Sequence, residues 1–150
     1  MIGIILSGHN HFATGLQSSL NLIAGDLANF AAIDFTGDLS IEDLKAKMSD
    51  ALVELNKNCD HTIIFTDLQG GSPFQAAAMV AMENSNVSVL AGTNLPMLIE
   101  INGARAFMDD AEMLVNMALS TGKEQIARLE LSTIMANDEP GDESLSRIQK

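Results

Sequence analysis

Short apolar runs alternate with helical patterns from the start of the chain to Gly122, and this alternation restricts the fold more than any other feature. The apolar runs are rich in β-branched residues, as expected of strands that are covered on both faces. They lie at residues 2–6, 30–35, 61–66 and 87–90. Strands that alternate with helices are typical of a parallel sheet with right-handed crossovers. The pattern predicts an α/β fold with four parallel strands and helices on both faces.

The helical patterns carry start signals. Residues 12–24 have apolar side chains at helical spacing. Ser40 is followed three residues later by Asp43, which is the spacing of a capping box. Ser72-Pro73 opens a third helix, because proline is tolerated in a first turn. Further helices are expected at residues 94–102 and 109–122.

The charge balance narrows the class of partner. The chain has 20 acidic and 8 basic residues among 150, a formal net charge of −12. This argues against nucleic acid and anionic membrane surfaces, which need clustered lysine and arginine. A basic protein partner suits the chain, because complementary charges speed encounter. No apolar run is long enough to span a bilayer, so direct membrane insertion is not expected.

The chain has one cysteine, Cys59, so an internal disulfide is impossible and a reducing, cytoplasmic location is expected. Three histidines without cysteine or glutamate at ligand spacing make a poor metal site. The glycine motifs of nucleotide binding and of hydrolases are absent from the sequence. We therefore expect one domain without a metal or a cofactor.

The character of the sequence changes after Gly122. Residues 126–134 alternate roughly by two between apolar and polar side chains, which is typical of a half-exposed edge strand. The residues beyond are polar and acidic, with Asp-Glu-Pro-Gly-Asp-Glu in their middle. The sequence thus predicts a domain over residues 1–134 and a flexible acidic tail over residues 135–150.

Two of the expected strands run into residues that suit phosphoryl chemistry. His9 follows the first strand and Asp67 follows the third. Ligands of open α/β sheets bind at the carboxyl ends of the strands. If these strands are neighbours, the imidazole and the carboxylate face each other. Asp67 would then accept the proton of one ring nitrogen and leave the other nitrogen free to attack a phosphoryl group.

Phosphoryl oxygens also need hydrogen-bond donors. The segment Gly70-Gly71-Ser72 opens a helix, and backbone N–H groups at a helix start bind anions. We therefore predict His9 and Asp67 as catalytic residues and Gly70, Gly71 and Ser72 as phosphoryl-binding residues.

Each of these features also has a plain structural explanation. A Gly-His pair after a strand is more often part of a loop than a catalyst, and Gly-Gly-Ser-Pro commonly makes a turn and a helix cap. His11 is a rival to His9, although packing or exposure at the rim is the expected role for it. The joint occurrence of these features after the first and third strands favours the catalytic interpretation.

Three blocks of the sequence form a specific combination. They are Gly8-His9 with Phe12-Ala13 and Gly15, the run from Thr66 to Phe74, and the run from Ala91 to Leu98. Together they resemble the IIA domain of the mannose-type family of the bacterial phosphoenolpyruvate-dependent sugar phosphotransferase system, over residues 1–134. The resemblance implies a flavodoxin-like fold and a homodimer in which the strand near residues 129–133 is added to the partner's sheet.

The resemblance further implies a phosphotransferase that works through a phosphohistidine. His9 would receive the phosphoryl group on Nε2 from the phosphocarrier protein HPr, with Asp67 on Nδ1 and with Ser72 and the Gly71 amide around the phosphoryl oxygens. A histidine of a separate IIB component would then accept it, and the membrane components IIC and IID would act on the sugar. In several relatives a glycine follows the active histidine; here it is Asn10, which tolerates left-handed backbone.

The family's partners imply a docking surface. An apolar ring around His9 is expected to include Leu68, Pro96 and Met97. Two alternative functions stay open, namely a IIA-like regulatory binding module and a phosphohistidine carrier of the dihydroxyacetone-kinase type. The presence of both His9 and Asp67 argues against the first, and the segment from Gly92 to Met97 favours sugar transport over the second.

Overall fold

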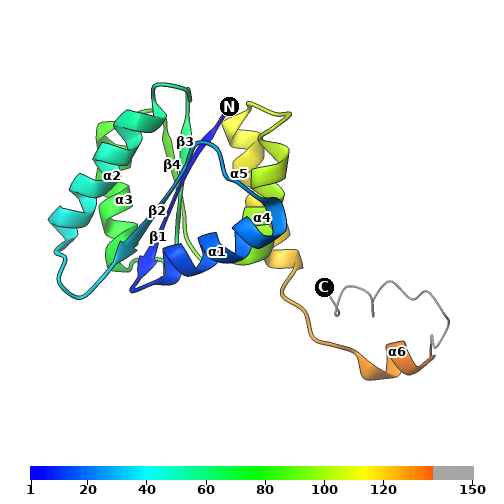
Figure 1. The fold of residues 1–150 in the computed structure, drawn as a ribbon. Coiled ribbons are helices and arrows are strands. Elements are labelled where there is room, and N and C mark those ends of the chain that lie inside the picture. The colour runs from blue at the N-terminus through cyan, green and yellow to red at the C-terminus, as the bar shows by residue number, and fades with distance from the viewer. Residues whose placement is uncertain (137–150) are drawn as a thin grey trace.

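The computed structural model describes residues 1–136, which form a parallel sheet with the strand order β2-β1-β3-β4 (Figure 1). The strands are β1 (Gly3–His9), β2 (Phe30–Phe35), β3 (Thr62–Thr66) and β4 (Val87–Leu90). The four parallel strands expected from the sequence are confirmed. Because β1 and β3 are direct neighbours, the residues that follow them meet at one edge of the sheet.

Helices cover both faces of this sheet. They are α1 (Phe12–Ala24), α2 (Ile41–Leu55), α3 (Ser72–Glu83), α4 (Leu95–Ala104) and α5 (Ala111–Glu124). The short helix α6 (Leu131–Ala136) lies apart from the sheet (Figure 1). Figure 1 shows α2 and α3 on one face and α1, α4 and α5 on the other. None of the helices within residues 1–136 combines the length and the apolar character that a membrane span requires.

The helix starts follow from their capping residues. Ser40 Oγ accepts a hydrogen bond from the Asp43 N–H at 3.1 Å, and the Asp43 carboxylate accepts one from the Ser40 N–H at 3.0 Å. The predicted capping box is therefore present at the start of α2. Asn94 and Asp110 cap α4 and α5 in the same general way, through their side-chain oxygens.

The core has two halves, one on each face of the sheet. Successive side chains of a strand point to opposite faces. Ile4 and Leu6 of β1 pack with α1, α4 and α5, whereas Ile5 packs with α2 and α3. All three side chains are fully buried, as expected of a strand in the middle of a sheet.

Strand β1 is longer than predicted, because it continues to His9 instead of ending at residue 6. Ser7 remains in the sheet although it is polar, since its hydroxyl donates to the Ile33 carbonyl at 2.8 Å. Gly8 remains because it lies against Phe12, whose Cδ1 would be 2.4 Å from a Cβ at this position. His9 is therefore a ladder residue at the end of a buried strand and not part of a loop.

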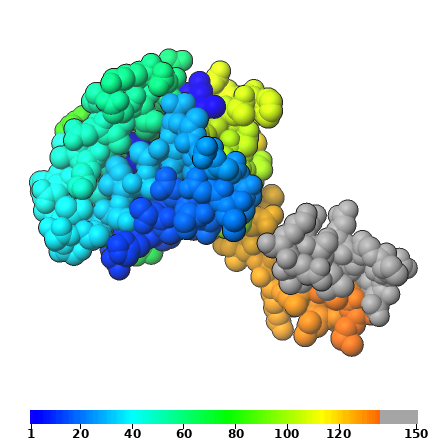
Figure 2. Space-filling view, viewed as in Figure 1, coloured from blue at the N-terminus to red at the C-terminus, as the bar shows by residue number. Residues whose placement is uncertain are grey.

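Within the single chain, residues 126–134 do not form the expected edge strand. Residues 126–130 have no regular secondary structure, and Leu131–Ala136 form the short helix α6. The segment leads away from the body of the molecule (Figures 1 and 2), and its apolar side chains, among them Ile126 at 78% exposed, contact no strand of this sheet. Side chains that alternate between apolar and polar stabilise a strand only when it pairs with a neighbouring strand. Pairing with a second copy stays a prediction, and the acidic tail lies from residue 137 onward outside the described residues.

A buried arginine ties together the opposite, amino-terminal edge of the sheet. Arg105 follows α4 and is only 3% exposed. Its guanidinium donates to the carbonyls of Ile2 at 2.9 Å and Asn29 at 3.0 Å, to the Ala28 carbonyl, and to Asn102 Oδ1 at 2.9 Å. One side chain thus fixes the entry to β1, the loop before β2 and the end of α4.

Candidate active site

His9 and Asp67 are in direct contact at the carboxyl edge of the sheet. His9 is the last residue of β1, and Asp67 directly follows β3. The His9 Nδ1 atom lies 2.7 Å from Asp67 Oδ2, and the His9 backbone N–H donates to the same oxygen at 2.8 Å. The predicted proximity of the imidazole and the carboxylate is therefore confirmed.

The surroundings of Asp67 keep its carboxylate ionised. Partial burial raises the pKa of this carboxyl, but hydrogen bonds from the His9 backbone and ring and from the Leu68 N–H outweigh it and leave the pKa below its ordinary value. An ionised carboxylate only accepts hydrogen bonds. The neutral His9 ring must therefore carry its proton on Nδ1, which leaves a lone pair on Nε2. The His9 side chain is 45% exposed, so a reactant can reach the ring.

The start of α3 closes one side of the histidine. Gly71 is the N-cap residue of α3, and a Cβ at this position would lie 3.1 Å from His9 Cε1. Gly70 has a φ of +80°, and its carbonyl accepts a hydrogen bond from Gln75 Nε2 at 3.0 Å. Both glycines are therefore needed, Gly70 for its conformation and Gly71 for its lack of a side chain.

Gly71 and Ser72 differ in whether their backbone N–H groups are free to bind a phosphoryl oxygen. The Gly71 N–H donates to the Leu68 carbonyl at 3.1 Å and so already serves the turn. Ser72 is the first residue of α3, where backbone N–H groups have no partner within the helix. Its half-buried side chain adds a hydroxyl. Pro73 lies in the first turn, as predicted, and is buried. Ser72 therefore offers the better donors of the glycine-rich segment.

The turn after His9 is anchored to the end of β2. Asn10 has a φ of 53°, which is the left-handed conformation that asparagine tolerates. Its N–H donates to the Phe35 carbonyl at 2.8 Å. The Phe35 ring meets the His9 ring in a T-shaped arrangement, with 5.9 Å between the centroids. Phe35 is not among the residues predicted from the sequence, although an expected strand that ends at residue 35 beside the first strand places it here.

A second histidine–aspartate contact lies beside this turn. His11 Nδ1 lies 3.2 Å from Asp34 Oδ2, and the His11 side chain is 73% exposed, which agrees with the expected position at the rim. Asp34 also accepts hydrogen bonds from the Thr14 N–H at 3.0 Å and the Thr14 hydroxyl at 2.7 Å. The carboxylate thus caps α1 from the neighbouring strand, because the N-cap residue His11 makes no side-chain cap bond.

The loop after β4 supports Asp67 from behind. The Thr93 hydroxyl donates to the Thr66 carbonyl at 2.7 Å, and the Gly92 N–H donates to the Asp67 carbonyl at 3.0 Å. Thr66 in turn donates from its hydroxyl to the Leu90 carbonyl at 2.7 Å. These bonds hold the backbone on both sides of the Asp67 peptide, so the position of the carboxylate is set by two loops.

The three predicted docking residues have different surroundings. Leu68 is 60% exposed beside His9, and Pro96 is half-buried at the start of α4. Met97 is only 3% exposed and belongs to the core, which corrects its expected place in a surface ring. The reason lies on α5, where Gly122 has no side chain and leaves room for the Met97 methyl group.

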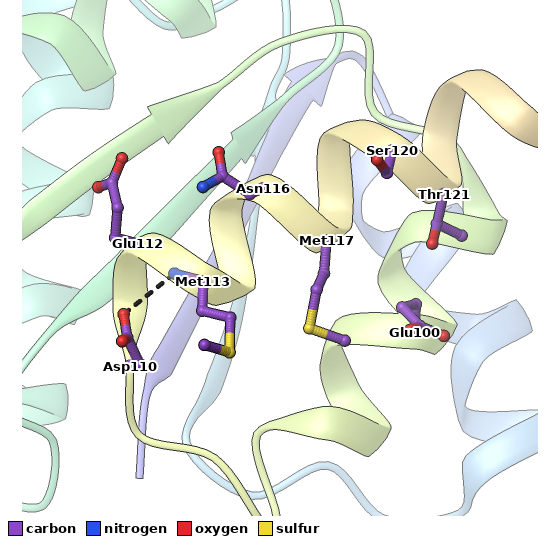
Figure 3. Close-up of a pocket in the computed structure, with 8 residues that line it drawn as sticks. All are labelled: Glu100, Asp110, Glu112, Met113, Asn116, Met117, Ser120 and Thr121. Carbon is purple, nitrogen blue, oxygen red and sulfur yellow. Dashed lines mark hydrogen bonds between the residues drawn. The ribbon is translucent and has the colours of Figure 1, made fainter.

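Two surface cavities of the described chain lie away from the His9 ring. One, of about 530 Å³, runs between α4 and α5 and is lined by Met113, Met117 and several polar residues (Figure 3). The other, of about 440 Å³, lies beside β2 and includes Asp34. Within residues 1–136 no cluster of histidine, cysteine or acidic side chains could hold a metal ion. The candidate site is thus built from His9 and Asp67, neither of which lines these two cavities.

Fold and site together define a class, namely α/β proteins that present a carboxylate-held histidine at the carboxyl edge of a parallel sheet. The model of the family described as PTS system fructose IIA component matches residues 3–119. The chain belongs to this family and is an EIIA component of the mannose family of the sugar phosphotransferase system. EIIA components act in sugar phosphotransfer.

Similar proteins support this membership along most of the chain. The PTS system fructose-specific EIIA component of Bacillus subtilis (strain 168) is 31% identical, over 97% of this chain and 100% of its own length. The sorbose-specific EIIA component of Lacticaseibacillus casei is 38% identical, over 65% of this chain and 70% of its own. The crystal structure of the EIIA component from Streptococcus agalactiae superposes with a TM-score of 0.79 at 30% identity, over 89% of this chain and 99% of that one.

Proposed function

We propose that this chain carries a phosphoryl group on His9 Nε2, which it receives from phospho-HPr and passes to a histidine of a IIB component. The single observation that carries the proposal is the 2.7 Å contact between His9 Nδ1 and Asp67 Oδ2. It fixes the proton on Nδ1 and leaves the Nε2 lone pair as the nucleophile. Family membership and the intact pair support the same role.

The transfer balances without any other reactant. A bond forms between His9 Nε2 and phosphorus while the bond from phosphorus to the donor's ring nitrogen breaks, and that nitrogen keeps the electron pair. The His9 ring then has substituents on both nitrogens and a positive charge, which the Asp67 carboxylate stabilises. Passage to IIB is the reverse step, with a IIB histidine as nucleophile. Phosphoryl transfer of this kind depends mainly on positioning and electrostatics.

The start of α3 is the proposed place for the phosphoryl oxygens. Ser72 contributes its backbone N–H and its hydroxyl, and the helix dipole favours negative charge there. Gly71 allows the His9 ring to approach this helix start closely. Because donor and acceptor are both proteins, an open surface suits the reaction better than an enclosed cavity. Exposed Leu68 and half-buried Pro96 are the proposed apolar contacts beside His9.

The net charge of −12 suits partners with basic residues near their histidines, because opposite charges accelerate encounter. We further propose that the chain works as a homodimer, in which the exposed segment at residues 126–136 packs against a second copy. Four exposed apolar side chains of this segment support an association of this kind. They are Ile126, Leu129, Leu131 and Met135.

A phosphoryl-transfer assay tests the proposal. Phosphoenolpyruvate, the first enzyme of the system, HPr and this chain are incubated together, and the modified peptide is mapped by mass spectrometry. We expect one acid-labile phosphoryl group on His9, none on the His9→Ala variant, and normal labelling of His61→Ala. His61 is the matched control because its Nε2 is engaged with Ser88 Oγ at 2.8 Å. Undiminished labelling of His9→Ala contradicts the proposal.

A further inference from the structure

The His9 ring has neighbours on more than one side, and only some of them belong to the chemistry described above. Asp67 Oδ2 lies at Nδ1, and Gly71 lies against Cε1. The remaining aromatic neighbour is Phe35, whose ring centroid is 5.9 Å from that of His9 at an interplanar angle of 83°. This distance and this angle are within the favourable range for edge-to-face aromatic pairs.

The sheet register explains why Phe35 is in this place. β1 and β2 are parallel, and His9 is the register partner of Phe35. Register partners in neighbouring strands direct their side chains to the same face. On this face Ile5 and Phe35 pack with the core beneath α2 and α3, and α3 begins beside the His9 ring. The imidazole therefore lies between β2 on one side and the start of α3 on the other.

Hydrogen bonds at Phe35 and at the preceding residue hold the end of β2 in place. Its carbonyl accepts the Asn10 N–H at 2.8 Å, which closes an isolated antiparallel bridge between the two residues. The preceding residue, Asp34, binds Thr14 at the start of α1 through two hydrogen bonds. The end of β2 is thus tied to the turn that follows His9, although β2 is an edge strand.

A single hydrogen bond at Nδ1 does not determine the orientation of an imidazole. The ring can still tilt about the line from Nδ1 to Asp67 Oδ2, and tilting moves Nε2 relative to Ser72. Contacts on both sides of the ring remove this freedom. We propose that Phe35 is a positioning residue for phosphoryl transfer, which keeps the His9 ring at the orientation that directs Nε2 toward the start of α3. This inference rests on the proposed function.

The test compares two leucine variants in the same strand. Phe35→Leu removes the aromatic contact, and Phe30→Leu makes the same change at the other end of β2, where Phe30 packs against the opposite core. We expect Phe35→Leu to lower kcat for phosphoryl transfer from phospho-HPr roughly threefold to tenfold, the size of an aromatic pair interaction, with KM unchanged. Phe30→Leu should leave both constants within about twofold.

A spectroscopic readout separates positioning from general loss of stability. Carbon-13 relaxation of the His9 ring C–H groups reports how freely the ring reorients. We expect a rigid ring in the unmodified chain and in Phe30→Leu, and a more mobile ring in Phe35→Leu. Phe35→Tyr retains the aromatic contact and should retain both the ring rigidity and kcat.

Three results overturn the inference. The first is an unchanged kcat and an unchanged mobility of the His9 ring in Phe35→Leu. The second is an equal loss of kcat in Phe30→Leu, which would assign the effect to strand stability. If Phe35→Leu does not fold, the third is a loss of kcat in well-folded Phe35→Tyr. Failure of the unmodified chain to accept a phosphoryl group on His9 refutes the proposed function instead, because the relaxation measurement needs no phosphoryl donor.

Discussion

One oxygen of Asp67, Oδ2, accepts two hydrogen bonds from His9, from Nδ1 at 2.7 Å and from the backbone N–H at 2.8 Å. The carboxylate therefore holds both the ring and the main chain of the same residue. The Leu68 N–H occupies the second oxygen at 2.8 Å. Both oxygens of the carboxylate are thus engaged, and a rotation of its side chain would break several bonds together.

Asp67→Asn tests what the carboxylate does for the ring. The amide nitrogen of asparagine donates to an unprotonated Nδ1 and so favours a proton on Nε2, which removes the nucleophile. We expect phosphoryl transfer to fall roughly 10²–10⁴-fold, as when a catalytic aspartate behind a histidine is replaced. Circular dichroism should show an intact fold. Asp60→Asn, at an exposed position, is the control, and equal rates for the two variants contradict this role.

Gly70 and Gly71 should respond to alanine in opposite ways. Gly70→Ala places a Cβ on a residue with a φ of +80° and no neighbour within 4 Å, so it should lower the free energy of unfolding by about 1–2 kcal/mol and spare the chemistry. Gly71 has an ordinary φ of −70°, but its Cβ would press on the His9 ring at 3.1 Å. Gly71→Ala should slow transfer at little cost in stability. Chemical denaturation and transfer rates, measured on both variants, test whether the loss of stability and the loss of activity separate in this way.

Two aspartates make the stability of the fold depend on pH in the acid range. Partial burial raises the pKa of Asp34, but hydrogen bonds from Thr14 and His11 outweigh it, and the pKa lies below 3.8, as it does for Asp67. A lowered folded-state pKa contributes stability that is fully present above the unfolded-state pKa and is lost as the pH falls through the folded-state value. Urea midpoints should therefore be flat from pH 7 to about pH 5 and fall below about pH 4. Asp34→Asn should flatten that decline, and an unchanged slope would refute the assignment.

Asp34 also contributes to stability at neutral pH through helix α1. Its carboxylate replaces the missing N-cap side chain by accepting the Thr14 N–H. Asp34→Ala should lower the free energy of unfolding by about 1 kcal/mol, as loss of a helix cap does. Asp60→Ala is a suitable control, because Asp60 is exposed and lies in the loop between α2 and β3. Thermal melts of the two variants should differ, and coincident melts would show that Asp34 is not a cap.

Arg105 is expected to be the most sensitive polar position distant from His9. Arg105→Met keeps the apolar bulk but removes the guanidinium donor from the carbonyls of Ile2, Ala28 and Asn29. The Asn29 carbonyl still accepts the Ile4 N–H. We expect a loss of about 3 kcal/mol in the free energy of unfolding, in line with buried hydrogen bonds to a charged group. Phosphoryl transfer by the fraction that remains folded should be normal. A loss below about 1 kcal/mol would show that water replaces the guanidinium.

Local signals in the sequence predicted most of the fold. The capping box of Ser40 and Asp43, proline in the first turn of α3 and the short β-branched runs each act within a few residues, so they can be recognised without a structure. The contact between His9 and Asp67 needed one further step, the adjacency of β1 and β3, which parallel order made a reasonable expectation.

The features that the sequence did not predict depend on contacts between residues far apart in the chain. The length of β1 depends on the Ser7 bond to β2, and the burial of Met97 depends on the absence of a side chain at Gly122. The alternation at residues 126–134 predicted a strand, but within the single chain residues 126–130 have no regular secondary structure and Leu131–Ala136 are helical, and pairing with a second copy stays a prediction. Arg105 gave no signal at all, because its partners are backbone carbonyls, which are alike in every sequence.

The attachment of His9 to the last rung of β1 has a consequence for the order of events. The main chain and the ring of His9 share one acceptor, Asp67 Oδ2, and this holds the residue in place. Under the proposed function, the phosphoryl donor and the phosphoryl acceptor must therefore both come to the same stationary Nε2 atom. Two proteins that reach the same nitrogen from outside occupy overlapping footprints and exclude each other. Donor and acceptor must therefore bind one after the other. The phosphorylated chain must remain intact between the two binding events.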